Sequence, residues 1–213
     1  SACSLDNMCY EPACVNGCDE AEVANEVMDE ACNETVGCAS PPCWCNGSGG
    51  CVEAPFLEKS GTISSSQTWT GTIYVSGNVY ISGAGNTLII SPGTVVKITP
   101  GYEIYVQDGA NIDVQGEAGN EIYFTSCRDQ TIGSDLSGEV GCSGSPTNRD
   151  VDYALYINNT AGTTSGTDFS YVNFRWADYG IYNSNSQIGS ITDSNFSQIY
   201  YSGIYIYDGS ISG

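Results

Sequence analysis

The pattern ALYI at residues 154–157 recurs as GIY at 180–182 and as GIYI at 203–206, so that a small residue precedes an aliphatic residue and a tyrosine. The aliphatic residues of successive copies are 26 and then 23 residues apart. A second mark, Asn-Phe, occurs at 173–174 and again 22 residues later at 195–196. Recurrence at such intervals is typical of solenoids, in which each coil buries its apolar edge against the next. The pattern therefore predicts a parallel β-solenoid.

Short alternating segments extend this pattern back to about Thr72. Each pairs two apolar residues at spacing two, which is typical of a strand with one buried face. An antiparallel sandwich is the alternative, but it usually has two-residue hairpin turns and does not predict the later repeats. The expected strands carry the pairs Ile73/Val75, Val79/Ile81, Leu88/Ile90, Val96/Ile98, Ile104/Val106, Ile112/Val114 and Ile122/Phe124.

A family resemblance enters with the run NTLIISPGTVVKITPGYEIYVQDGANIDVQGEAGNEIYFTS, residues 86–126. Its PGTVVK motif, its alternating VQDGANIDVQG segment and its closing IYFTS are similar to the opening coils of the right-handed parallel β-helix proteins of the pectate-lyase-like superfold. The resemblance covers about residues 70–213. It implies an all-β, right-handed β-helix but no activity, because that superfold hosts lyases, hydrolases, adhesins and inert surface proteins.

Residues 1–58 form a different region, expected to be a small acidic, disulfide-rich domain. Its one expected short helix spans 19–32, with Asp19 and Glu20 at the positive N-terminal end. Residues 59–71 are expected to be a linker or first strand, and 72–213 the β-helix. The cysteine spacings match no zinc or iron–sulfur motif, so disulfides of unknown connectivity are favoured. The head cysteines are Cys3, Cys9, Cys14, Cys18, Cys32, Cys38, Cys43, Cys45 and Cys51.

The other two cysteines, Cys127 and Cys142, bound a polar Gly/Ser-rich segment that interrupts the strand rhythm. We expect residues 127–150 to be a loop closed by a disulfide between these two. Nine cysteines then remain in the head, and an odd number cannot all pair within one chain. The unpaired cysteine is either a free thiol or part of an intermolecular disulfide.

The formal net charge of −20, from 25 acidic and five basic residues, argues against nucleic-acid binding by phosphate neutralisation. Such acidity fits solubility in an extracellular or salty setting; the other interpretation is calcium held between carboxylates of neighbouring chains. No further cofactor is expected, and no apolar run is long enough to span a membrane.

The eleven cysteines favour an extracellular or cell-surface location, because disulfides persist in oxidising compartments. The chain starts at Ser1 without methionine, which we interpret as a mature product whose leader has been removed. Four Asn-X-Ser/Thr sequons predict a glycoprotein. They are Asn33, Asn46, Asn158 and Asn195.

The repeats also predict an exposed aromatic ladder. If Leu155, Ile181 and Ile204 face inward, the tyrosine after each faces outward, one strand spacing apart. Such a ladder either stabilises the solenoid or offers a contact surface for sugars or proteins. The expected members are Tyr156, Tyr182, Tyr205 and Tyr207.

No catalytic constellation is visible, and we expect a protein that is not an enzyme. Asp150 and Asp152 share a parity, and Lys97 and Arg175 lie in predicted strands, but no spacing forces an acid–base pair into one cleft. The remaining aspartates are interpreted as turn residues that accept backbone hydrogen bonds. They are Asp168, Asp178, Asp193 and Asp208.

These features predict an extracellular structural protein, a subunit of a self-assembling filament, sheath or surface layer. Its contacts would involve the solenoid end, which shows no capping segment, and the head, with an intermolecular disulfide as one means of linkage. The partner is expected to be the chain itself, with glycans as further partners. Two alternatives stay open: a carbohydrate-binding or carbohydrate-active β-helix, and a cell-surface adhesin.

Overall fold

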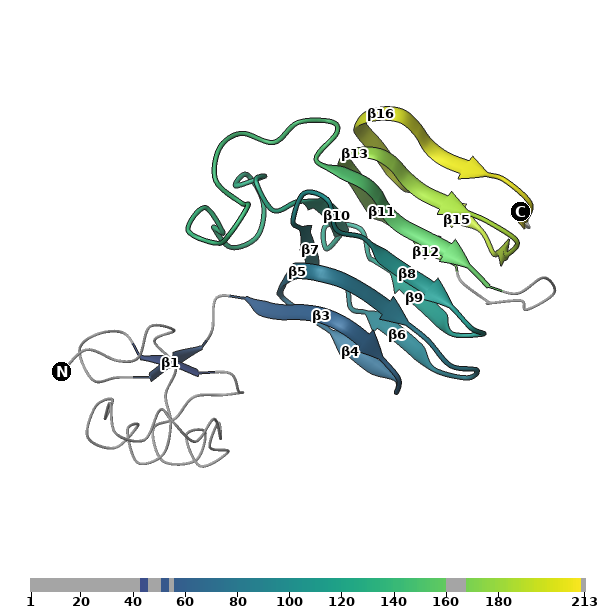
Figure 1. Ribbon diagram of the computed structural model, residues 1–213, viewed down its shortest axis with the longest axis horizontal. Coiled ribbons are helices and arrows are strands. Elements are labelled where there is room, and N and C mark those ends of the chain that lie inside the picture. The colour runs from purple at the N-terminus through teal and green to yellow at the C-terminus, as the bar shows by residue number, and fades with distance from the viewer. Residues whose placement is uncertain (1–42, 46–50, 54–55, 160–167, 212–213) are drawn as a thin grey trace. The chain divides into compact units, whose positions relative to one another are not determined.

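The computed structural model describes residues 43–45, 51–53, 56–159 and 168–211 (Figure 1). The chain divides between Leu57 and Glu58 into two units. In the first, β1 (Cys43–Cys45) and β2 (Cys51–Glu53) pair antiparallel, with Cys45 opposite Cys51. The predicted helix at 19–32 and the other head cysteines lie outside the described residues.

The described residues of the second unit form three sheets. The largest has eight strands: β3 (Leu57–Ile63), β5 (Thr72–Ile81), β7 (Val95–Ile98), β8 (Ile104–Gln107), β10 (Ile122–Ser126), β11 (Val151–Asn158), β13 (Val172–Asn183) and β16 (Asn195–Ile206). A five-stranded sheet contains β4 (Gln67–Trp69), β6 (Thr87–Ile90), β9 (Asn111–Gln115), β12 (Phe169–Ser170) and β15 (Ile191–Thr192). The third pairs β14 (Gln187–Ile188) with β17 (Ser210–Ile211).

The strand pairings among β4 to β17 are parallel, so the described part of the chain is all-β with parallel sheets and no helix. The antiparallel sandwich considered from the sequence is therefore wrong for this region. In Figure 1, strands of the two large sheets alternate along the chain from β3 to β6, and β11, β13 and β16 lie side by side. The stretch expected to be a linker or first strand contains β3 and β4.

Strand register follows the sequence repeats. Leu155 of β11 pairs with Ile181 of β13, which pairs with Ile204 of β16. The two Asn-Phe pairs at 173–174 and 195–196 are also register partners. Because the side-chain period of a strand is two, this register places the repeated apolar residues on one face. The predicted alignment of the three repeats is confirmed.

The core consists of the inward apolar residues of these strands. The predicted strand pairs from Ile73/Val75 to Ile122/Phe124 are all buried. Phe174 stacks on Phe124 at a ring-centroid distance of 5.0 Å and on Phe196 at 5.1 Å. Aromatic pairs at this separation stabilise beyond the area that they bury. One column of three stacked phenylalanines thus links β10, β13 and β16.

The small residue of the repeat has a packing cause at Gly180. A Cβ at this position would lie 2.6 Å from the carbonyl oxygen of Gly203 and 2.7 Å from the Phe196 ring. Gly203 is similarly close to Phe196. The glycines therefore permit β13 and β16 to approach beside the phenylalanine column, where a side chain at 180 would clash with backbone and one at 203 with the Phe196 ring.

Bends recur at equivalent positions of neighbouring strands. Trp176 in β13 has φ 62° and Gln198 in β16 has φ 51°, and the pairing of Ala177 with Ile199 places these two residues opposite each other. A positive φ is unusual for residues with side chains and turns the strand sharply. The long strands β13 and β16 are therefore bent at the same level.

Residues 127–150 connect β10 to β11 without a strand of their own, and the connection projects beyond the sheets in Figure 1. A disulfide joins Cys127 and Cys142, the pairing expected from the sequence, with a Cα–Cα distance of 5.1 Å. Both cysteines are fully buried.

Candidate functional site

A ladder of five tyrosines follows the largest sheet; three of its steps are stacked, and the step from Tyr105 to Tyr156 is tilted by 47°. Its ring centroids are 5.0 Å apart between Tyr80 and Tyr105, 5.3 Å between Tyr105 and Tyr156, and 5.0 Å between Tyr156 and Tyr182 and between Tyr182 and Tyr205. All four steps join register partners on adjacent parallel strands. The strand spacing of about 4.8 Å therefore sets the ring spacing.

A second column lies beside this tyrosine ladder. Tyr153 stacks on Tyr179 at 5.4 Å, and Tyr179 stacks on Tyr201 at 5.3 Å. The columns meet edge to face, with Tyr153 4.8 Å from Tyr182 and Tyr179 5.6 Å from Tyr205. Edge-to-face contacts pair the positive edge of one ring with the negative face of another. The second column extends the predicted aromatic surface into a two-column sheet of rings.

The predicted ladder residues differ in exposure. Tyr156 and Tyr182 are half-buried because neighbouring rings cover both of their faces. Tyr205 is 38% exposed at the end of the column. Tyr207 is 71% exposed and makes no ring contact within the described part of the chain. Tyr207 lies one residue beyond the end of β16, so it does not extend the stacked column.

Burial and neighbouring groups raise the pKa values of Tyr105, Tyr153 and Tyr182. The Tyr105 hydroxyl donates a hydrogen bond to Glu103 Oε2, and burial followed by this contact raises the pKa of Tyr105. Burial likewise raises the pKa of Glu103, and the charge of Asp152 adds to that rise. The pKa values of Tyr153 and Tyr182 are raised first by burial and then by neighbouring rings. These hydroxyls therefore stay protonated well into alkaline solution.

A second carboxyl group, Asp178, borders the ring surface. Burial raises the pKa of Asp178, although the Arg149 guanidinium at 3.5 Å opposes the rise. Arg149 also lies 4.5 Å above the Tyr200 ring, a cation–π contact. Asp152, which lies between the register pairs Val151/Ala177 and Tyr153/Tyr179, is exposed and raises the pKa of Asp178 further.

The other aspartates considered from the sequence serve local structure. Asp168 Oδ1 accepts hydrogen bonds from the Ser190 backbone N–H at 2.6 Å and from its hydroxyl at 3.0 Å. Asp193 sits at a bend with φ 48°, and Asp208 is exposed. Within the described residues, no three histidine, cysteine, aspartate or glutamate residues lie close enough to hold a metal ion.

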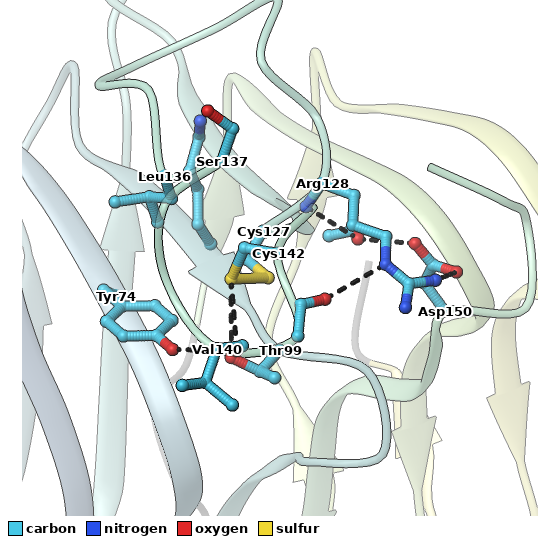
Figure 2. The surroundings of a disulfide bond; sticks show 12 residues. Tyr74, Thr99, Cys127, Arg128, Leu136, Ser137, Val140, Cys142 and Asp150 are labelled. Carbon is cyan, nitrogen blue, oxygen red and sulfur yellow. Dashed lines mark hydrogen bonds and ion pairs between the residues drawn. A yellow bond between two sulfur atoms is a disulfide. The ribbon is translucent and has the colours of Figure 1, made fainter. Parts of the chain in front are cut away.

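Asp150 forms hydrogen bonds and an ion pair at the base of the disulfide-closed loop (Figure 2). Its carboxylate accepts hydrogen bonds from Ser126 at 2.7 Å and from Thr147 at 2.7 Å, and it pairs with Arg128 at 3.2 Å. Asp150 is buried, whereas Asp152 is exposed, so the two do not share an environment as their parity suggested. The reason is that Asp150 precedes β11 and belongs to the loop.

Figure 2 shows Tyr74 on the opposite side of the disulfide from Asp150. The Tyr74 hydroxyl donates to the Val140 carbonyl at 3.2 Å, and Arg128 Nε donates to the Gly141 carbonyl at 3.0 Å. The loop residues beside Cys142 are therefore held from β5 and from the loop's own start.

Beneath this loop lies a buried group of charges. Lys97 of β7 is fully buried, and its Nζ donates to the Ser134 carbonyl at 2.5 Å and to Gln130 Oε1 at 3.2 Å. Arg175 of β13 pairs with the buried Asp129 at 3.0 Å. The two strand cations singled out from the sequence thus both contact loop residues, which periodicity alone does not predict.

Two of the four sequons can be placed. Asn158, the last residue of β11, and Asn195, the first of β16, are both exposed. Asn33 and Asn46 lie outside the described residues.

Comparison with known proteins assigns the chain to no family. No family model matches it, and neither a curated protein nor a solved structure is significantly similar. Among the described residues, no helix is long and apolar enough to cross a membrane.

Proposed function

We propose that the chain is an extracellular structural protein whose parallel sheets are the faces of a right-handed β-helix, and that it is a subunit of a surface filament, sheath or surface layer. Two findings support the solenoid. Neighbouring strands along the chain fall largely in different sheets, and residues 22 to 26 apart are register partners. Such pairing is how successive coils of a solenoid contact each other.

The covalent chemistry supports the extracellular location. The disulfide between Cys127 and Cys142 is fully buried at the base of a surface loop. Disulfides of this kind form in oxidising compartments and are rare in the cytosol. The nine cysteines of the head add to this argument.

The proposed assembly depends on the exposure of β16 and on its unpaired edge. None of its residues is buried, although they include Phe196, Ile199 and Ile204. The register partners of these three in β13 are completely buried. One edge of β16 pairs with β13, and within the described residues its other edge pairs with no strand. An apolar strand with a free edge is a template for another strand.

The surface around this edge is aromatic. Five of the eight exposed large hydrophobic side chains of the described region lie between Tyr200 and Tyr207. Tyr201 and Tyr205 each end a stacked column and are 56% and 38% exposed. A second copy that presents a strand here would continue the sheet and cover both columns. Repeated head-to-tail contacts of this kind produce filaments.

The same stacking argues against the carbohydrate alternative. A sugar platform needs open ring faces, but both faces of Tyr182 are covered by stacked neighbours, and Tyr105 and Tyr156 each have one stacked and one tilted neighbour. The ladder is therefore better suited to stiffening the protein than to binding glycans. The adhesin alternative concerns the head, most of which lies outside the described residues.

Charge substitution at β16 tests the proposal. We expect the wild-type chain to self-associate as its concentration rises, and the Tyr201→Lys, Tyr205→Lys double variant to associate about 100-fold more weakly, because an unpaired ammonium group is costly to bury at an interface. Sedimentation velocity in the presence of reductant measures this noncovalent association.

The matched control is Tyr102→Lys. Tyr102 is 38% exposed, as is Tyr205, but it lies outside β16. This variant should associate like the wild type. A wild-type chain that stays monomeric at every concentration, or a double variant that associates unchanged, would contradict the proposed contact.

A further inference from the structure

The amine of Lys97 faces the carboxamide of Gln130 inside a closed site. Lys97 Nζ lies 3.2 Å from Gln130 Oε1, and Lys97 is completely buried between β7 and the disulfide-closed loop. The loop holds both partners, since Lys97 Nζ also contacts the Ser134 carbonyl at 2.5 Å. An amine and a carbonyl group are thus held in contact and shielded from water.

Burial prepares the lysine as a nucleophile. Removal from water disfavours the charged form and lowers the pKa of Lys97, although the charges of Asp129 and Asp135 oppose this effect. The neutral amine is the form that attacks a carbonyl carbon, and desolvation is one way in which proteins activate lysine.

The carboxamide is held and polarised. Gln130 Oε1 accepts a hydrogen bond from the Leu136 backbone N–H at 2.9 Å in addition to the contact with Lys97. Its Nε2 donates to the carbonyl of Cys127 at 2.9 Å and of Cys142 at 3.5 Å. A donor aimed at a carbonyl oxygen stabilises the negative charge that develops there when the carbon is attacked. The two carbonyls fix the nitrogen that would leave.

Asp129 is the main source of negative charge acting on the amine, but it does not contact Lys97. It is fully buried, and its oxygens contact Thr125, Thr131 and Arg175. The proton transfer of the reaction is therefore assigned to the two nitrogens themselves.

We propose that Lys97 and Gln130 form an intramolecular amide cross-link. The lysine nitrogen attacks Cδ of Gln130, a new C–N bond forms, and the original bond between Cδ and Nε2 breaks. One proton passes from the lysine nitrogen to the departing nitrogen. Neutral lysine amine and carboxamide thereby become a secondary amide and a released ammonia, with no oxidant or reductant consumed. The cross-link ties β7 to the same loop as the disulfide, but reductant does not cleave it.

Mass spectrometry of the full-length chain tests the cross-link directly. After reduction and denaturation, the wild-type chain should be lighter than its sequence mass by one ammonia. Trypsin should fail to cut after Lys97, and the digest should contain a branched peptide that joins Lys97 to Gln130.

Two variants separate the cross-link from other losses of ammonia. Lys97→Arg keeps the positive charge and the hydrogen-bond donors but has no amine to acylate, so it should have the full sequence mass. Gln130→Met keeps a side chain of similar size but has no carboxamide to attack, so it should also have the full sequence mass.

Three results would overturn the proposal. One is a wild-type chain of unmodified mass, which needs no variant to interpret. Another is an ammonia loss that persists in Lys97→Arg or maps elsewhere, for example to cyclisation at Asn46-Gly47. An ammonia loss that persists in Gln130→Met would exclude Gln130 as the acyl donor.

Discussion

Replacement of Phe174 by alanine is expected to lower the free energy of unfolding by about 3–5 kcal/mol. Phe174 is completely buried and is the middle ring of the column formed with Phe124 and Phe196, and it also lies 6.3 Å from Phe169. Its removal leaves a cavity between three strands and breaks two stacking contacts at once. Chemical denaturation followed by circular dichroism measures the change.

Phe196→Ala is the matched control for this substitution. Phe196 lies in the same column but ends it, and it is only half-buried. Phe196→Ala should therefore lower the free energy of unfolding by less than Phe174→Ala does, because less apolar surface is lost from the core. Equal losses for the two variants, or a loss of less than about 1 kcal/mol for Phe174→Ala, would contradict a continuous phenylalanine core.

Removal of the disulfide, by Cys127→Ser with Cys142→Ser, is expected to lower the free energy of unfolding by about 3 kcal/mol. The reason is that the bond closes a short loop and restricts the unfolded chain. The two cysteines are separated by 15 residues. Their hydrogen-bonded surroundings, including the contacts of Tyr74 with Val140 and of Arg128 with Asp150, remain in the variant. Urea denaturation of the two proteins gives the difference.

Reduced wild-type protein provides the control for the disulfide, since it loses the bond without a change of sequence. It should unfold at nearly the same urea concentration as the double serine variant in the same reductant, in which the head cysteines of both proteins are reduced. Unchanged stability in both samples would show that the loop is constrained by other contacts alone.

The periodic part of the fold was predictable because it depends on local pattern. The interval between Leu155, Ile181 and Ile204 gave the strand register, since buried residues must align between neighbouring strands. The glycines at 180 and 203 have a physical cause in the phenylalanine ring that they flank. The finer prediction of a right-handed β-helix depends on the family resemblance and remains a proposal.

The first half of the tyrosine ladder was not predicted because an insertion obscures its period. Tyr105 and Tyr156 lie on adjacent strands, yet 51 residues separate them in the sequence. The loop at 127–150 falls within that interval. A signal for the second column was present, since Tyr153 and Tyr179 each precede a ladder tyrosine by three residues.

The charges beneath the loop could not be predicted for a different reason. Lys97 contacts Gln130 and Ser134 only because the irregular loop returns over β7. No periodic pattern specifies the path of such a loop, and a glutamine carries no signal of its own. The contact between Arg175 and Asp129 depends on the same loop.

The parallel, in-register stacking of the repeats is tested most directly by methyl–methyl nuclear Overhauser effects in a chain with labelled leucine and isoleucine methyl groups. Adjacent parallel strands lie about 4.8 Å apart, so cross-peaks should connect Leu155 with Ile181 and Ile181 with Ile204. The absence of both cross-peaks, together with contacts typical of hairpin-paired strands, would contradict the stacking.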